Sequence, residues 1–252
     1  MNALELAQVT ADPIQTLGLS FYFDPVTAAH GRELGLNPYE FYGLGRAGVL
    51  GDASLDEVEA AFTFFHRRTL ERMYENARAK AEPVATSRRY IQEAYGFADR
   101  TFGAVPVGVL VDVADATRAT ARAVPPGRHH LFDGYRAADW PTDPVHAAYL
   151  STIWLRELRG GVHMDAVAAV GLSPLEACYL QDVGLFKLHG YVDDEAPVVT
   201  AEHEAMKVRA EQLTSESMAE FFATLTDAQR ESLADGTAQM YAALATPVAV
   251  TN

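Results

Sequence analysis

The chain has 252 residues, which is enough for one large domain or for two domains of roughly 100 to 150 residues each. Its 49% hydrophobic and 21% charged residues are ordinary for a globular protein, and the single cysteine, Cys178, excludes an internal disulfide. The net charge of −14 works against nucleic-acid binding, because such binding gains affinity from Lys and Arg on phosphates.

Helix-start and helix-stop signals divide the first half of the chain. Asp24-Pro25 and Asn37-Pro38 are capping residues followed by proline, and Gly35 ends the helix between them. Ser54 caps a longer helix whose apolar residues recur at three- and four-residue spacing. The helices predicted here cover residues 25–34, 38 onward, 54–78, 87–101 and 107–124. Residues 125–141 contain glycines and prolines without periodicity, which predicts a linker or a loop that covers a pocket.

Similar signals continue in the second half. Asp143-Pro144 and Ser173-Pro174 open helices, and Gly160-Gly161 predicts a stop between them. The residues on either side of a turn at 193–195 predict a small two-stranded wing. The predicted helices cover residues 144–159, 164–170, 174–188, 201–222 and 227–245, and the tail at 247–252 is predicted to fray.

The beginning of the chain and its hydropathy indicate the compartment. Met1 to Val9 lack the basic stretch of a signal peptide, and no apolar run reaches the roughly 20 residues of a membrane span. We therefore expect a cytoplasmic protein without a membrane partner. Cys178 lies among apolar residues and is interpreted as a buried thiol rather than as a nucleophile.

A six-residue pattern occurs twice. Gly-Leu-Asn-Pro-Tyr-Glu at 35–40 is echoed by Gly-Leu-Ser-Pro-Leu-Glu at 171–176, and each copy follows a predicted short helix. The match favours a duplication over two independent helix turns. Duplicated halves often pack about a pseudo-twofold axis, and ligand sites often lie where they meet.

Several segments together resemble the SalK-like helix-turn-helix family of actinobacteria, some of whose members are encoded beside natural-product pathways. The matching segments are Tyr22-Phe23 and residues 42–51, 62–66, 146–148 and 155–163. The resemblance implies a mainly α fold, with two related winged-helix-like halves packed as a pseudo-dimer and a small β wing. The corresponding division is residues 1–124, a linker or pocket-covering loop at 125–141, and residues 142–252.

The sequence departs from that family at positions that bear on the ligand. The family usually has tyrosine and asparagine where Thr63 and Phe64 stand, and a histidine and an acid where Leu158 and Gly161 stand. These changes remove polar groups from the segments expected to line a pocket. They favour an apolar or aromatic ligand.

Two histidines are candidates for acid–base catalysis. His66 follows the aromatic segment of the first half, and His163 follows the predicted break at Gly160-Gly161. The structural alternative for His66 is packing in the core or a hydrogen bond to the backbone, and for His163 it is capping of the turn. Arg46, among glycines, suits an anionic group, and so do Arg156 and Arg159, although an ion pair of Arg156 with a glutamate is the alternative.

Aromatic residues gather in the first half. Most must belong to the core, but tyrosines beside phenylalanines also suit a flat apolar ligand with a few polar groups. The aromatic residues predicted to bind substrate are Tyr22, Tyr39, Tyr42 and Phe64.

The spacing of the eight histidines offers no paired metal ligands, so no metal site is predicted. A haem or metal held by a single histidine needs no motif, so the cofactor stays undetermined. Serine-hydrolase and dinucleotide-binding motifs are absent from the sequence.

The predicted helix 174–188 has few base-reading side chains, and the acidic turn after it would repel phosphates. The basic stretch at 67–89 is interrupted by glutamates, which indicates an ion-paired surface. The sequence therefore predicts a small-molecule-binding protein, with an enzyme of specialised metabolism that acts between the halves as the favoured form. A winged-helix transcriptional regulator and a non-catalytic binding or resistance protein are the alternatives. Reaction class and oligomeric state stay open.

Overall fold

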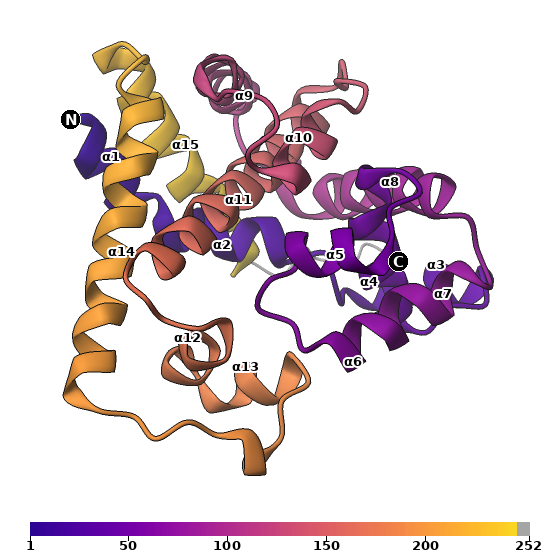
Figure 1. The fold of residues 1–252 in the computed structure, drawn as a ribbon. Coiled ribbons are helices and arrows are strands. Elements are labelled where there is room, and N and C mark those ends of the chain that lie inside the picture. The colour runs from indigo at the N-terminus through magenta and orange to yellow at the C-terminus, as the bar shows by residue number, and fades with distance from the viewer. Residues whose placement is uncertain (246–252) are drawn as a thin grey trace.

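The computed structural model describes residues 1–245, in which every regular element is a helix (Figure 1). The predicted frayed tail at 247–252 lies outside the described residues. The first half comprises α1 (Ala3–Val9), α2 (Ala11–Leu19), α3 (Pro25–Glu33), α4 (Pro38–Ala47), η1 (Gly48–Leu50), α5 (Leu55–Ala61), α6 (Arg67–Leu70), η2 (Glu71–Glu75), α7 (Asn76–Arg78), α8 (Pro83–Phe102) and α9 (Val107–Ala123). The second half comprises α10 (His130–Arg136), α11 (Pro144–Ala169), α12 (Pro174–Gln181), α13 (Val183–Leu188), η3 (Asp193–Glu195), α14 (Ala201–Phe222) and α15 (Asp227–Leu244).

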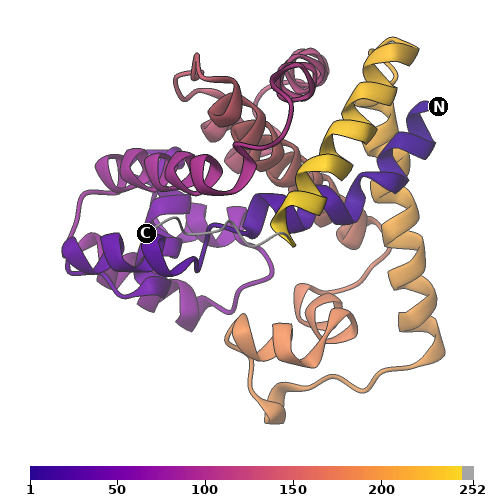
Figure 2. The ribbon, with the colours of Figure 1, turned by 180° about the vertical axis from the view of Figure 1, so that it is seen from behind.

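Helix α11 is the central element, and α2, α8, α9, α10 and α14 pack around it (Figures 1 and 2). The side chain of Asp143 caps its start by accepting hydrogen bonds from two backbone amides. Between Ala147 and Leu158, nearly every residue of α11 is buried, whichever way it points. A helix buried on all sides belongs to the middle of a core. The halves of the chain therefore share one main core.

The predicted stop at Gly160-Gly161 is wrong, because α11 runs through both glycines without interruption. A glycine inside a helix costs only about 1 kcal/mol, which packing on both sides of it can offset. Position 161 has no room for a side chain, since a Cβ atom there would lie 2.6 Å from Nδ1 of His129.

The single helix predicted over 54–78 is also wrong. It is interrupted at residues 62–66 and contains the π-helical stretch η2. Phe62 leaves the helical conformation at φ −111° and ψ 38°, and the backbone N–H of His66 donates to the carbonyl of His189 at 2.9 Å.

The predicted β wing is wrong as well. The described residues contain no strand, and the segment around 193–195 forms η3 instead. Glu195 forms an ion pair with Arg68, and its carboxylate lies 3.3 Å from Nε2 of His66, so the turn is tied to α6 and does not fold back as a hairpin. The predicted helix 174–188 divides at Asp182, whose extended backbone and side chain cap α13.

The predicted helices at 25–34, from 38, at 107–124, 201–222 and 227–245 are confirmed as α3, α4, α9, α14 and α15. The helix predicted over 87–101 is also confirmed, as α8, although it begins at Pro83. Residues 125–141 contain α10, which buries Leu131, Phe132 and Tyr135. No helix of the described residues is both long enough and apolar enough to cross a membrane.

The two copies of the repeated pattern adopt the same local structure. Gly35 and Gly171 have φ values of 74° and 84°, the left-handed region that favours glycine. The next residue donates to a carbonyl five positions back, at 3.0 Å for Leu36 and 3.2 Å for Leu172. Each following helix begins with a proline and a reciprocal capping box, formed by Asn37 with Glu40 and by Ser173 with Glu176.

Candidate functional site

A buried ion pair joins α4 to α11. Arg46 donates from Nε to Oε1 of Glu157 at 2.9 Å and from Nη2 to Oε2 at 2.7 Å. Both residues are buried, with exposed fractions of 8% and 3%. The neighbouring Gly45 lets α4 approach α8 closely, because a Cβ atom at that position would collide with the ring of Tyr90. The paired geometry is the one in which guanidinium and carboxylate groups bind each other most strongly.

A second arginine and two tyrosines complete what we name the arginine cluster: Tyr22, Tyr42, Arg46, Arg156 and Glu157. Nη1 of Arg156 donates to Oε1 of Glu157 at 2.9 Å and to the hydroxyl of Tyr22 at 3.0 Å. That hydroxyl donates to Glu157 at 3.2 Å. Nη1 of Arg46 donates to the hydroxyl of Tyr42 at 3.0 Å.

The arginine cluster contains two guanidinium groups and one carboxylate. Burial raises the pKa of Glu157, but the charges of Arg46 and Arg156 outweigh that effect and hold its pKa below the ordinary value. Burial also raises the pKa of Tyr22, which keeps its hydroxyl protonated. The cluster therefore encloses one excess positive charge, and burying an unpaired charge is costly.

Aromatic rings surround the guanidinium groups. The Arg46 guanidinium lies 4.5 Å from the ring centre of Phe62, and that of Arg156 lies 5.1 Å from the ring centre of Tyr22. The ring of Phe65 packs 4.1 Å from the ring of His189, centre to centre. Aromatic rings therefore lie against both guanidinium groups of the cluster.

His189 is the histidine whose protonation the cluster affects. Burial, and then the charges of Arg46 and Arg156, lower the pKa of His189 to about 4. Its Nδ1 lies 3.0 Å from Sγ of Cys178. His189 is therefore neutral at pH 7, and it lies within electrostatic reach of both arginines.

Three buried polar atoms beside the cluster have no hydrogen-bond partner in the described structure: the hydroxyls of Tyr90 and Tyr135, and Nε of Arg156. Both tyrosine side chains are fully buried. Burial raises the pKa of Tyr135 well above its usual value. The charge of Glu157 raises this pKa further, and the charges of Arg46 and Arg156 lower it. Buried polar groups normally have partners, so these three donors are the unusual feature of the site.

The predicted histidines lie elsewhere. His66 caps α6 by accepting from the backbone N–H of Arg68 at 3.1 Å, and its Nε2 lies 3.3 Å from Glu195. His163 lies on α11 with Nδ1 3.0 Å from the hydroxyl of Thr214, and burial lowers its pKa. His66 therefore hydrogen-bonds to the backbone, as its structural alternative predicted, whereas His163 caps no turn, because α11 is continuous there.

Four of the predicted ligand-binding residues meet in the arginine cluster, namely Tyr22, Tyr42, Arg46 and Arg156. The other three do not. Arg159 pairs with Glu211 at 2.8 Å, Phe64 packs against His163, and Tyr39 is 42% exposed.

The sequence reasoning missed His189, Tyr90 and Tyr135, and no local motif could have found them, because they come from three different parts of the chain. Cys178 is a buried thiol, as predicted, and burial raises its pKa to about 12. It is therefore protonated at neutral pH and unsuited to nucleophilic attack.

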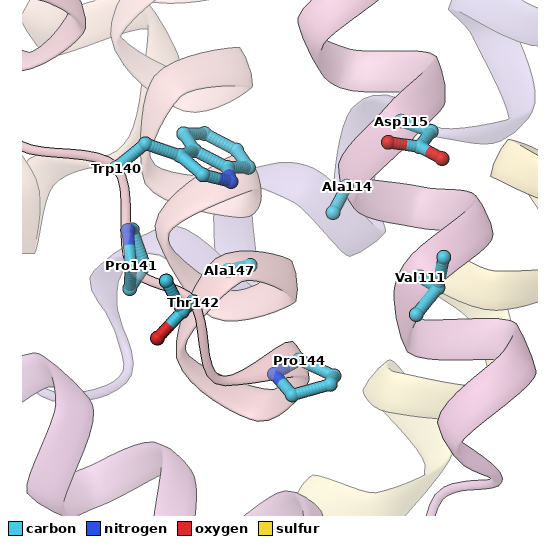
Figure 3. A pocket seen from close by; sticks show the side chains of 8 residues that line it. All are labelled: Val111, Ala114, Asp115, Trp140, Pro141, Thr142, Pro144 and Ala147. Atoms are coloured by element: carbon cyan, nitrogen blue, oxygen red, sulfur yellow. The ribbon is translucent and has the colours of Figure 1, made fainter.

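A separate cavity of about 280 Å³ lies between α9, the start of α11 and the residues before it (Figure 3). Trp140 and Asp115 stand on opposite sides of it, and the guanidinium of Arg118 lies 5.2 Å from a ring centre of Trp140. None of the residues that line it belongs to the arginine cluster: Val111, Ala114, Asp115, Trp140, Pro141, Thr142, Pro144 and Ala147.

In the described residues, one group of side chains could hold a metal ion. Potential ligand atoms of Asp99, Asp143 and His146 lie within 4.8 Å of one another. Both aspartates are exposed, and each already has a role: Asp99 pairs with His146 at 2.8 Å, and Asp143 caps α11. These contacts explain the grouping without an ion.

The part of the chain that the structure describes is all-helical, each of the two matched turns joins two helices, and the buried arginine cluster is built by Tyr22, α4 and α11. The model of a helix-turn-helix family matches residues 7–187, well over half of the chain. The chain therefore belongs to this helix-turn-helix family. No curated protein and no solved structure matches it.

Proposed function

We propose that this protein binds a small molecule at the arginine cluster and does not read DNA. The observation that carries the proposal is the excess positive charge enclosed with three donors that lack partners. Structural ion pairs are usually balanced, whereas binding sites keep groups ready for a ligand. The rings of Phe62 and Tyr22, which lie against the guanidinium groups of Arg46 and Arg156, support an apolar or aromatic ligand.

The helix that follows the first turn is unsuited to DNA. Every residue of α4 from Glu40 to Ala47 is buried, so this helix has no face that could enter a major groove. The helix that follows the second turn, α12, contains no lysine or arginine, and its charged residue is Glu176. Base recognition by α12 would lack the side chains that most often contact guanine.

The basic stretch at 67–89 is largely neutralised within the protein. Arg67 pairs with Asp56 and Glu59, and Arg68 pairs with Glu195. The other ion pairs of this stretch are Arg78 with Asp52, Lys80 with Glu40 and Arg89 with Glu93. Side chains engaged in this way release few counterions from DNA, which lowers the expected affinity.

A transcriptional regulator is the second candidate, and family membership favours it. In that form, the two matched turns would mark related halves that act as a fused dimer, with a ligand at the cluster controlling the α12 unit. The enzyme form of the proposal keeps His66 and His163 as the predicted acid–base residues. Alanine variants that fold and retain turnover would eliminate that assignment.

The proposal is tested on the protein as purified. Native mass spectrometry should show a small molecule that is released on unfolding and is lost in the Arg46→Gln variant but retained in Arg209→Gln. Arg209 pairs with Glu216 on the exposed side of α14, so its loss leaves the cluster intact. Tight binding to a DNA duplex that weakens steeply with salt, together with no bound molecule, would refute the proposal.

A further inference from the structure

We propose, as an extension of the proposed function, that the ligand is an aromatic monoanion of the carboxylate class. Its charged group would be held by Nε of Arg156 and the hydroxyls of Tyr90 and Tyr135. It would enter beneath residues 183–195.

The charge of the ligand follows from the arginine cluster. Arg46 and Arg156 carry two positive charges, Glu157 carries one negative charge, and Tyr22 is protonated. One further negative charge makes the buried group neutral. A dianion would replace the positive excess by a negative one, and a cation would add to the excess. A monoanion is therefore the charge state that removes the cost of burial.

The donors fit a planar anion. A carboxylate has two oxygens and accepts about four hydrogen bonds, and it provides no donor that would compete. The hydroxyls of Tyr90 and Tyr135 and Nε of Arg156 are donors that have no acceptor in the described structure. Leaving such a donor unpaired typically costs about 1–3 kcal/mol, so binding a carboxylate would recover part of that free energy.

The aromatic character of the ligand follows from the aromatic side chains around the arginine cluster. The rings of Tyr22 and Phe62 border the guanidinium groups, Phe65 packs near the ring of Tyr42, and the neutral ring of His189 packs on Phe65. Rings of this kind bind another ring by stacking or edge contacts while the charged end reaches the arginine. An aliphatic acid would make fewer of these contacts.

The entry route follows from the weak attachment of residues 183–195. Helix α13 has one buried residue, Phe186, and η3 has none. This segment meets the first half through Glu195, which pairs with Arg68, and through the carbonyl of Gly190, which accepts from Arg68 at 3.2 Å. His189 adds two contacts: its carbonyl accepts from the backbone N–H of His66 at 2.9 Å, and its ring packs on Phe65. Segments with few buried contacts open at low free-energy cost. Displacing this one would expose the cluster on the side of His189.

Benzoate and benzamide form a matched pair of probes, because they share the ring and differ in charge. Isothermal titration at constant ionic strength should give an affinity for benzoate at least about tenfold higher than for benzamide. Equal affinities, or no detectable benzoate binding, would overturn the inference. Arg156→Gln should abolish the preference for benzoate. Arg159→Gln is the control, because Arg159 lies on the same helix but pairs with Glu211; this variant should keep the preference for benzoate.

Tyr135→Phe separates a binding role from a structural one. The Tyr135 hydroxyl has no partner in the protein, so its removal should leave the melting temperature unchanged or higher while weakening benzoate about tenfold. Unchanged benzoate affinity in this variant would overturn the assignment of the hydroxyl. Glu195→Gln should accelerate benzoate association, and an unchanged rate would refute entry beneath residues 183–195.

Failure of this inference differs from failure of the proposed function. A neutral molecule that co-purifies with the protein, combined with equal affinities for the two probes, leaves a small-molecule-binding protein without a carboxylate site. DNA binding without any co-purified molecule would refute both the small-molecule function and the carboxylate site.

Discussion

Arg46 and Glu157 lie 111 residues apart in the chain and form two hydrogen bonds inside the core, so α4 and α11 are joined by a buried ion pair. Glu157 is also the only carboxylate that the arginine cluster contains. Its loss would leave two buried guanidinium groups facing each other.

Glu157→Gln should therefore lower the free energy of unfolding by about 3–5 kcal/mol, because breaking a buried pair leaves an uncompensated charge. Urea unfolding at pH 7 measures the change. The control is Glu211→Gln, which breaks the more exposed pair with Arg159 and should cost at most about 1 kcal/mol. Similar losses in the two variants would contradict a dominant role for the buried pair.

His189 should make the protein sensitive to mild acid. Its pKa is about 4 when folded, against about 6.5 in the unfolded chain, so below pH 6.5 the unfolded state binds the proton first. The stability contributed by the neutral ring is complete above pH 6.5 and is lost as the pH falls toward 4. The total loss is about 3 kcal/mol.

Comparison of Tm at pH 7 and pH 5 measures this effect in the wild type and in His189→Gln, which cannot titrate in that window. The variant should show a shallower dependence on pH. His130→Gln, which removes an exposed histidine on α10, should behave like the wild type. If the difference in Tm between pH 7 and pH 5 is unchanged in His189→Gln, His189 is not the cause of the acid sensitivity.

The turn glycines should be costly to replace. Gly171→Ala forces a side chain into the left-handed region at φ 84°, so we expect a loss of about 1–2 kcal/mol in unfolding free energy. Gly160→Ala is the matched control, because Gly160 lies in α11 with no atom near the position of its Cβ. That change should stabilise by about 0.5–1 kcal/mol. Equal effects of the two changes would contradict the turn geometry.

Cys178 should report on the opening of the α12–α13 unit. Its thiol is buried and its pKa is about 12, so iodoacetamide should label the folded protein at pH 8 far more slowly than the unfolded protein. Glu195→Gln should accelerate labelling several-fold by releasing the contacts with Arg68 and His66. Glu216→Gln, on α14, should not. Fast labelling of the wild type would show that the unit is open.

Local signals in the sequence predicted most helix starts. Asp24, Asn37, Ser54, Asp143 and Ser173 each cap a helix, because capping depends on one side chain and the amides two or three residues later. The repeated Gly-Leu-polar-Pro pattern predicted two matching turns for the same reason. These features need no contact with the rest of the protein.

The predictions that failed concern segments whose conformation depends on distant partners. Helix α11 continues through Gly161, against which His129 packs, and residues 62–66 leave the helix where His66 meets His189. No periodicity within those segments carries that information. The wing was predicted from local turn signals, but Glu195 has its ion-pair partner, Arg68, on α6.

By itself, the sequence determined the helical class, the cap positions, the two turns and the acidic surface, since each depends on residues close together in the chain or on composition. Only the tertiary structure decided which polar residues meet. Burial gathered Arg46, Arg156 and Glu157 with the hydroxyls of Tyr90 and Tyr135, and it separated His66 and His163 from them. Electrostatic effects between buried groups depend on distances in space, and residues far apart in the sequence set those distances here.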